Sequence, residues 1–280
     1  MEERARPLMN SWSLFSPCTN IVIFGSKNET VKDRCRTVRY IFVKVPARST
    51  PHLHRLKVYQ DFLARAIAEG SILSDDRILI TDARDAVIQT PFFSHPLSKR
   101  YLTESDLLFS KEGSKGGEVT FCEDSRDRAR WNHRWISVCF GSEALQALER
   151  CDHCHVICSG AFAGKALALV DFLTIVDDTI NTLGSECTST HGADQGVFNF
   201  IIWLGILRNT TLDYHVANNW ESPIFTLGLG SPYAILRSGL VIPEGSRHFP
   251  SLLHQYDRNK ELYTYIQKRY EDFNNETTNV

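Results

Sequence analysis

The stretch RILITDARDAVIQTPFF, residues 77–93, decides how this chain is organised. Its apolar run from Ile78 to Ile80 predicts a short strand that is buried on both faces. The run ends abruptly at Asp82-Ala83-Arg84-Asp85. Two acids and an arginine directly after a buried strand lie where α/β folds place their ligand chemistry. We therefore predict a ligand site at this end of the strand.

The sequence before this stretch predicts an α/β fold. NIVIFG at residues 20–25 and RYIFVKV at residues 39–45 are apolar enough to form strands. Apolar residues then recur at helical spacing from Tyr59 to Ile67, and Gly70 supplies a stop. Strand, strand, helix and strand in this order predict a Rossmann-type sheet, mixed but mostly parallel, flanked by helices.

The rest of the chain is expected to complete one compact domain over residues 1–280, with halves at residues 18–125 and 126–280. Residues 94–117 are polar and lack strong periodicity, which predicts a loop. Asp257 would cap the last helix. We predict strands at residues 117–122, 155–164, 212–216, 223–227 and 233–236, and helices at residues 142–150, 165–183, 195–207 and 258–270.

The composition is that of an ordinary globular protein, with 280 residues, 42% hydrophobic and 23% charged. A formal net charge of -2 gives no reason to expect nucleic acid or an acidic membrane as a partner. No apolar run approaches the roughly 20 residues of a membrane span. Charged and polar residues interrupt the first 15 residues, so we predict no signal peptide and a cytoplasmic, soluble protein.

Asp82 and Asp85 are the first candidates for metal ligands. An Asp after a strand often caps the turn, and a single Asp would support no more than that. A diphosphate beside both carboxylates would be repelled, and a bound cation reverses the sign of that interaction. Hard oxygen ligands favour Mg²⁺ or Mn²⁺ over zinc. Arg84 would contact phosphate or carboxylate, or brace the turn.

DARDAVIQTPFF resembles the D-x-R-D-[VA]-[VI]-x-Q-x-P-F stretch of a group of GT-A-fold glycosyltransferases. Further stretches are similar to segments of that family in the expected order, between Arg55 and Leu262: HRLKVYQDFLARAI, CSGAFAG, GADQGVFNFIIW and LLHQYDRNKEL. Arg84 stands where a strict D-x-D motif has its second acid. The size and the absence of a membrane anchor also resemble the soluble glycosyltransferases of large algal viruses, which would place a viral protein in the host cytoplasm.

The resemblance implies a GT-A-like fold and a metal-dependent glycosyltransferase. Such an enzyme moves a sugar from a UDP-sugar, with UDP-xylose as the best guess, to a hydroxyl of a glycan acceptor. Asp82, Asp85 and His254 would hold Mn²⁺ or Mg²⁺, although a histidine near a helix start is as often packed or hydrogen-bonded. The donor-binding residues that the resemblance implies are Gly25, Ser26, Arg55, Asp82, Arg84, Asp85, Ser159, Gly160 and Arg258.

Asp194 is the candidate catalytic base. Inverting transfer needs one carboxylate near the acceptor hydroxyl, and in the family an acid at the start of this helix holds that position. The same acid could merely complement the helix dipole. We favour inversion. Trp220 is the candidate stacking surface for the acceptor, although a tryptophan is at least as often packed in a core.

The eight cysteines show no regular disulfide framework. Cysteines and histidines crowd together between Cys151 and Cys158 and raise the possibility of zinc. A structural zinc site normally has a second ligand pair at a distance in the sequence, and none is evident. We therefore interpret Cys151, Cys154 and Cys158 as buried structural thiols.

Two other functions compete with glycosyl transfer. Acid clusters at strand ends also serve metal-dependent phosphohydrolases and nucleotidyltransferases, which release phosphate or pyrophosphate rather than a nucleoside diphosphate. A non-catalytic module on the same fold would bind carbohydrate without turnover, and replacing Asp194 would leave that binding unchanged. The sequence contains no Walker loop, nucleophile elbow or dinucleotide fingerprint.

Overall fold

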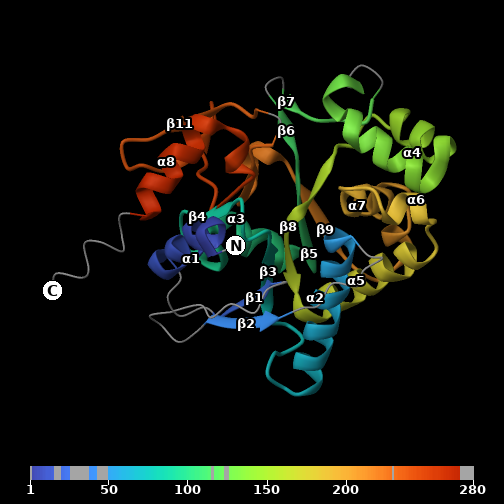
Figure 1. Cartoon of the computed structure of the whole chain (residues 1–280), viewed down its shortest axis with the longest axis horizontal. Helices are drawn as coiled ribbons and strands as arrows, with labels where there is room; N and C mark the ends of the chain where they lie inside the picture. The colour runs from blue at the N-terminus through green and yellow to red at the C-terminus, as the bar shows by residue number, and fades with distance from the viewer. Residues whose placement is uncertain are drawn as a thin grey trace.

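The computed structural model describes residues 2–15, 20–25, 38–42, 50–114, 117–122, 126–228 and 230–271. Its central feature is a four-stranded sheet in the order β3-β8-β5-β9 (Figure 1). These strands are β3 (Arg77–Thr81), β8 (Ile157–Lys165), β5 (Leu107–Lys111) and β9 (Tyr214–Ala217). Strand β8 runs antiparallel to both of its neighbours, whereas β5 and β9 are parallel.

The fold is therefore mixed α/β, and the prediction of a mostly parallel sheet is wrong. A strand covered on both faces is a continuous apolar run whichever way its neighbours point, so the sequence pattern carried no information on direction. A second sheet has the order β10-β13-β4 and also mixes directions. Its strands are β10 (Ile224–Thr226), β13 (Leu252–His254) and β4 (Ala86–Ile88).

The remaining described strands form three small pairs. Strands β1 (Ile21–Gly25) and β2 (Val38–Phe42) are parallel. The other two pairs are antiparallel: β11 (Tyr233–Ile235) with β12 (Val241–Pro243), and β6 (Gly113–Ser114) with β7 (Gly117–Glu118).

The helices cover the sheets from both sides (Figure 1). The α-helices are α1 (Glu2–Phe15), α2 (Pro51–Ala68), α3 (Pro96–Glu104), α4 (Arg126–Glu149), α5 (Ala166–Asn181), α6 (Ser185–Thr188), α7 (Ala193–Trp203) and α8 (Lys260–Glu271). Short 3-10 turns occur at Phe92–Ser94, Leu207–Asn209, Asn219–Glu221 and Tyr256–Arg258. Helix α4 is kinked at Gly141, so its last part coincides with the helix predicted at residues 142–150.

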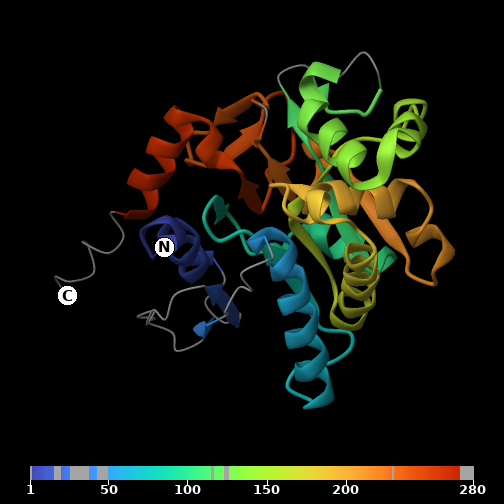
Figure 2. The ribbon, with the colours of Figure 1, turned by 45° about the vertical axis from the view of Figure 1, so that its right-hand side comes forward.

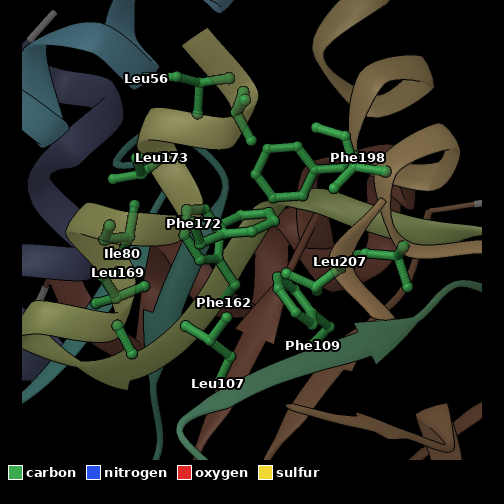
Figure 3. Packing of buried hydrophobic residues seen from close by; sticks show 14 of the residues in the cluster. Leu56, Ile80, Leu107, Phe109, Phe162, Leu169, Phe172, Leu173, Phe198 and Leu207 are labelled. Carbon is green, nitrogen blue, oxygen red and sulfur yellow. The ribbon is translucent and has the colours of Figure 1, made fainter. Parts of the chain in front are cut away.

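The largest hydrophobic cluster lies between the central sheet and helices α2, α5 and α7. Four aromatic rings from two strands and two helices meet in it, with Leu56 and Leu173 beside them (Figure 3): Phe109, Phe162, Phe172 and Phe198. Ile78 and Ile80 of β3 pack into this cluster, and Leu79 packs into a second cluster. Strand β3 is thus covered on both faces, as predicted, because alternate side chains point to opposite sides of a strand.

Helix α1 lies beside β4 and α8, which brings the beginning and end of the described chain together (Figure 2). Asn10 donates to the carbonyl of Tyr270 at 2.6 Å. Ser11 is fully buried, and its hydroxyl oxygen accepts a hydrogen bond from the backbone N–H of Ile88 at 2.9 Å. The sequence reasoning did not predict α1.

Three local predictions are wrong. Residues 94–117 hold α3 and the central strand β5 instead of a loop, because elements of nine and five residues are too short to show a clear period. The strand predicted at residues 117–122 is reduced to β7, which spans Gly117–Glu118. The last helix starts at Lys260, and the Asn259 side chain, rather than Asp257, accepts from the Leu262 N–H.

The cysteine prediction also needs correction. Cys139 and Cys187 form a disulfide, and Cys151 and Cys154 form another, so the last two are not free thiols. Cys158 is a buried free thiol, as predicted. Among the described residues, no helix has the length and apolar character needed to cross a lipid bilayer.

Candidate functional site

Strand pairing brings Asp82 to Gly160. In the antiparallel ladder between β3 and β8, Thr81 lies opposite Ala161. The next residue continues this register, because the N–H of Asp82 donates to the carbonyl of Gly160 at 2.8 Å. The acid that follows β3 is therefore fixed against the middle of the longest strand of the central sheet.

A different ladder brings His254 to Asp85. Strand β4 begins directly after Asp85, and its first residue, Ala86, pairs with His254 at the end of β13. The N–H of Gln255 then donates to the Asp85 carbonyl at 2.7 Å. Residues about 170 positions apart in the chain are thus held side by side by sheet hydrogen bonds.

Asp82, Asp85 and His254 form one group, the acid–histidine cluster. One ligand atom from each residue lies within 4.8 Å of the others. His254 Nε2 is 3.7 Å from Asp82 Oδ2 and also 3.7 Å from Asp85 Oδ1. The side chains of His254 and Asp85 are 0% and 4% exposed, whereas that of Asp82 is 30% exposed. The cluster is therefore buried on one side and open at Asp82.

Two buried atoms of this cluster lack a hydrogen-bond partner, namely Asp85 Oδ1 and His254 Nε2. A buried polar atom without a partner costs roughly 1–3 kcal/mol, so native proteins rarely retain one without a reason. Both atoms face the same point, and both are good donors to a divalent cation. The residues present therefore fit a metal ion.

Gly160 makes room for the His254 and Asp82 side chains. A Cβ atom on Gly160 would lie 2.5 Å from Cε1 of His254 and 2.7 Å from Oδ2 of Asp82. Contacts this close do not occur in folded proteins, so any side chain here would displace the two ligands. Glycine is needed because the strand passes directly beneath the cluster.

The charges of the cluster favour a positive ion between the carboxylates. Burial opposes ionisation of Asp82, but Arg55 and His254 outweigh it and lower the pKa of Asp82 to about 2. Burial raises the pKa of Asp85. Burial alone would lower the pKa of His254, yet Cys158, Asp82 and Asp85 raise it well above its usual value. The negative charges that stabilise a proton on His254 would stabilise a bound metal cation in the same place.

Arg55 connects the acid–histidine cluster to Asp194. From the first turns of α2 its guanidinium forms one ion pair with Asp82 and another with Asp194 at 2.7 Å. Asp194 stands in the first turn of α7, 4% exposed, and also accepts from Ser159 Oγ at 2.9 Å. The predicted base and the predicted metal ligand thus share one arginine. Burial alone would lower the pKa of Arg55, but Asp82 and Asp194 outweigh burial and raise it above its ordinary value. The guanidinium of Arg55 is directed at these two carboxylates rather than at solvent, where a residue that binds a phosphate group would point.

Arg84 and Arg258 lie at the rim. Their side chains are 50% and 53% exposed, and both approach the Asp257 carboxylate, at 3.7 Å and 3.6 Å. Arg84 also lies 3.6 Å from Asp85. Two half-exposed guanidinium groups beside the cluster are suitably placed for an anionic ligand.

The other predicted residues lie elsewhere or outside the described part. Trp220 packs in a third hydrophobic cluster, with its ring centroid 5.8 Å from that of Phe225, which matches the core alternative. Gly25 ends β1. Ser26 lies outside the described residues. The acceptor and nucleotide roles of these three residues stay predictions.

The sequence reasoning missed three neighbours of the cluster. Cys158 Sγ lies 3.4 Å from His254 Nδ1, and Gln255 Nε2 lies 3.9 Å from the same sulfur. Glu112 is buried, which raises its pKa, and bonds to Gln195 and Cys158 oppose that shift. Cys158 was detectable, since it precedes Gly160 by two residues and so shares its strand face. Glu112 was not, because its segment was predicted to be a loop.

No protein-family model matches this chain, and no curated protein matches it with a significant score. The family resemblance in the sequence therefore stays a prediction. The site itself offers two carboxylates and an imidazole for a divalent ion, a separate buried carboxylate, and a cationic rim. This set can hold a charged phosphate group beside a proton acceptor.

Proposed function

We propose that the protein is a metal-dependent glycosyltransferase that uses a UDP-sugar and transfers the sugar to a hydroxyl of a glycan, with inversion. One observation carries the proposal. Five stretches that resemble glycosyltransferase segments are far apart in the sequence, and each supplies a side chain or backbone group to the same site. The contributing residues are Arg55, Asp82, Asp85, Ser159, Gly160, Asp194 and His254.

Asp82, Asp85 and His254 would hold Mn²⁺ or Mg²⁺, whose charge would offset that of the departing diphosphate. Arg84 and Arg258 would bind the diphosphate oxygens from the rim, because both guanidinium groups are half exposed and lie beside Asp85 or Asp257. Gly160 would let His254 and Asp82 hold the metal directly over β8, because any side chain at this position would collide with both.

Asp194 would take the proton from the acceptor hydroxyl. Both hydrogen bonds of its carboxylate end at Oδ2, one from Arg55 and one from Ser159. This fixes the orientation of the group and leaves Oδ1 to receive the proton. Arg55 would keep Asp194 and Asp82 together, so that the acceptor and the leaving group lie on neighbouring sides of one guanidinium.

The proposal is tested by thermal unfolding in the presence of UDP-sugars, UDP-xylose among them, with and without Mn²⁺. We expect stabilisation of about 2–3 kcal/mol when donor and metal exceed their dissociation constants about a hundredfold. Neither alone should reach this value. An assay for UDP release with mixed glycan acceptors then reports turnover.

The products separate the competing functions. Release of UDP that depends on an acceptor supports glycosyl transfer. Release of phosphate or pyrophosphate would favour a phosphohydrolase or nucleotidyltransferase instead. Binding of carbohydrate with no released nucleotide for any donor would indicate a non-catalytic module.

A further inference from the structure

A second group of metal-binding side chains shares no residue with the acid–histidine cluster. Cys151, His153 and Cys154 follow the end of α4, and one ligand atom from each lies within 4.8 Å of the others. Cys151 and Cys154 are joined as a disulfide, and His153 Nε2 lies 3.6 Å from the Cys151 sulfur. His153 is exposed and Cys151 half-buried, whereas Cys154 is buried among hydrophobic residues.

Cys122 lies next to this group across a short antiparallel pairing. Thr120 and His155 form an antiparallel bridge, and the N–H of Phe121 donates to the carbonyl of Cys154 at 3.0 Å. Extending this register by one more residue places Cys122 opposite His153, where paired Cβ atoms lie about 4.5–5.5 Å apart. The Cys122 thiol in fact donates to the Cys151 carbonyl at 3.8 Å, across 29 residues of sequence.

One distance in this group already suits a tetrahedral ion. Zinc binds sulfur at about 2.3 Å and imidazole nitrogen at about 2.0–2.1 Å, so the nitrogen–sulfur edge of a zinc tetrahedron measures about 3.6 Å. The His153–Cys151 distance of 3.6 Å equals this edge. Three sulfurs and one nitrogen also form one of the common ligand sets of structural zinc sites.

We propose that Cys122, Cys151, His153 and Cys154, the cysteine–histidine cluster, bind one zinc ion when the Cys151–Cys154 disulfide is reduced. A dithiol passes two electrons and two protons to the sulfur–sulfur bond, which opens to two thiols while the dithiol closes to its own disulfide. Zinc then binds the three thiolates and His153, and the three thiol protons leave to solvent. The Cys122 thiol exchanges its carbonyl partner for the metal.

The position of the site gives the ion a structural role. Phe121, Cys154 and Leu148 belong to one hydrophobic cluster at the junction of α4 and the segment after β7. Zinc would join the turn after α4 to that segment through Cys122, whereas the disulfide of the oxidised form links only Cys151 and Cys154 within the turn. This inference does not depend on the proposed glycosyl transfer.

The test uses the whole chain, reduced with a phosphine under nitrogen and titrated with Co²⁺ and then Zn²⁺. We expect about one Co²⁺ per chain with strong thiolate-to-cobalt absorption, and its loss when Zn²⁺ displaces cobalt. Carboxylates and imidazole give no such absorption. Cys158→Ser removes the thiol beside His254, and Cys139→Ser removes a thiol of the other reduced disulfide, so both variants should keep the absorption. The Asp82→Ala variant should keep the absorption unchanged.

Two variants and one chemical step locate the ligands. Cys122→Ser should reduce the absorption and weaken zinc binding by more than about tenfold, since even the loss of an outer partner of a metal ligand costs 10–100-fold. His153→Ala, at an exposed position that folding does not need, should weaken binding in the same way. Addition of a diazene oxidant to the zinc-loaded protein should release the ion as the disulfide reforms and the diazene is reduced to a hydrazine.

Three results would contradict the proposed zinc site. A reduced wild-type protein without thiolate-to-cobalt absorption would overturn the proposal, whatever its content of other metals. Unchanged absorption in Cys122→Ser would remove Cys122 from the site. Retention of zinc after the oxidant has reformed the disulfide would show that the ion is held elsewhere.

Discussion

The acid–histidine cluster and the cysteine–histidine cluster both gather metal ligands, but the chain builds them in opposite ways. Asp82 and Asp85 share one segment, whereas His254 comes from a distant one, and two strand ladders place the three together. Cys151, His153 and Cys154 are neighbours in sequence, and the short turn after α4 brings them together by itself. The first cluster contains buried atoms without partners, whereas two of the sulfurs in the second are satisfied by each other.

Under the two proposals, this difference separates a site for turnover from a site for stability. The buried atoms without partners lie beside a carboxylate that is 30% exposed, so a metal bound there would be open to solvent at Asp82. A closed set of sulfur and nitrogen ligands has no free position for a substrate. We expect the first cluster to prefer ions with oxygen ligands and the second to prefer zinc.

Replacing Asp82 should have the largest effect on the first cluster. We predict that Asp82→Ala lowers UDP release by more than about 100-fold, because it removes a ligand and the partner of Arg55 together. The matched control is Asp75→Ala, an exposed acid just before the start of the same strand. Initial rates with saturating UDP-sugar measure the effect. Near-normal rates in Asp82→Ala would contradict the assignment.

Replacing Asp194 should separate chemistry from binding. Asp194→Asn keeps the size of the side chain and can still accept from Ser159, but it cannot take a proton. We predict a loss of about 10²–10⁴-fold in kcat. The stabilisation by donor and Mn²⁺ in thermal unfolding should remain. If donor binding is lost with kcat, Asp194 has a structural role instead.

Adding one methyl group at Gly160 should weaken the metal site without changing a ligand. We predict that Gly160→Ala lowers Mn²⁺ affinity by about tenfold or more, because the new Cβ displaces His254 and Asp82. Gly184→Ala is the control, since no atom lies within 4 Å of a Cβ there and its φ is −70°. Isothermal titration with Mn²⁺ compares the two. Cobalt absorption by the cysteine–histidine cluster should be the same in both variants.

The smallest effect should be on stability in acid. Since the pKa of Asp82 is lowered to about 2 in the folded protein, its ionised form stabilises the fold above the unfolded pKa near 4. That contribution, about 2 kcal/mol, disappears as the pH falls toward 2. Urea unfolding of Asp82→Asn should therefore show a flatter loss of stability between pH 4 and pH 2.5 than the wild type. Parallel curves would mean that Arg55 does not stabilise Asp82.

The sequence predicted the elements of the acid–histidine cluster better than its connections. Runs such as residues 77–81 and 157–165 are apolar enough to be recognised, and Asp82 follows the first of them directly. Strand direction was wrong because burial on both faces does not report it. The link from Arg55 to two acids was invisible, since it depends on how α2 and α7 pack.

For the cysteine–histidine cluster, the neighbouring ligands could be read from the sequence and the pairing that adds Cys122 could not. That connection rests on one bridge between Thr120 and His155, in a segment with only two residues of strand. Short pairings of this kind leave no periodic pattern to read.

Ser11 of α1 has a consequence for the outer strand of the second sheet. Strand β4 lies at the edge of its sheet, and the N–H of Ile88 points away from the neighbouring strand. The hydroxyl of Ser11 accepts the hydrogen bond of this N–H. An uncovered edge offers a template on which another chain can add a strand. Fragments that begin after Phe15 should therefore self-associate through β4, which light scattering would reveal.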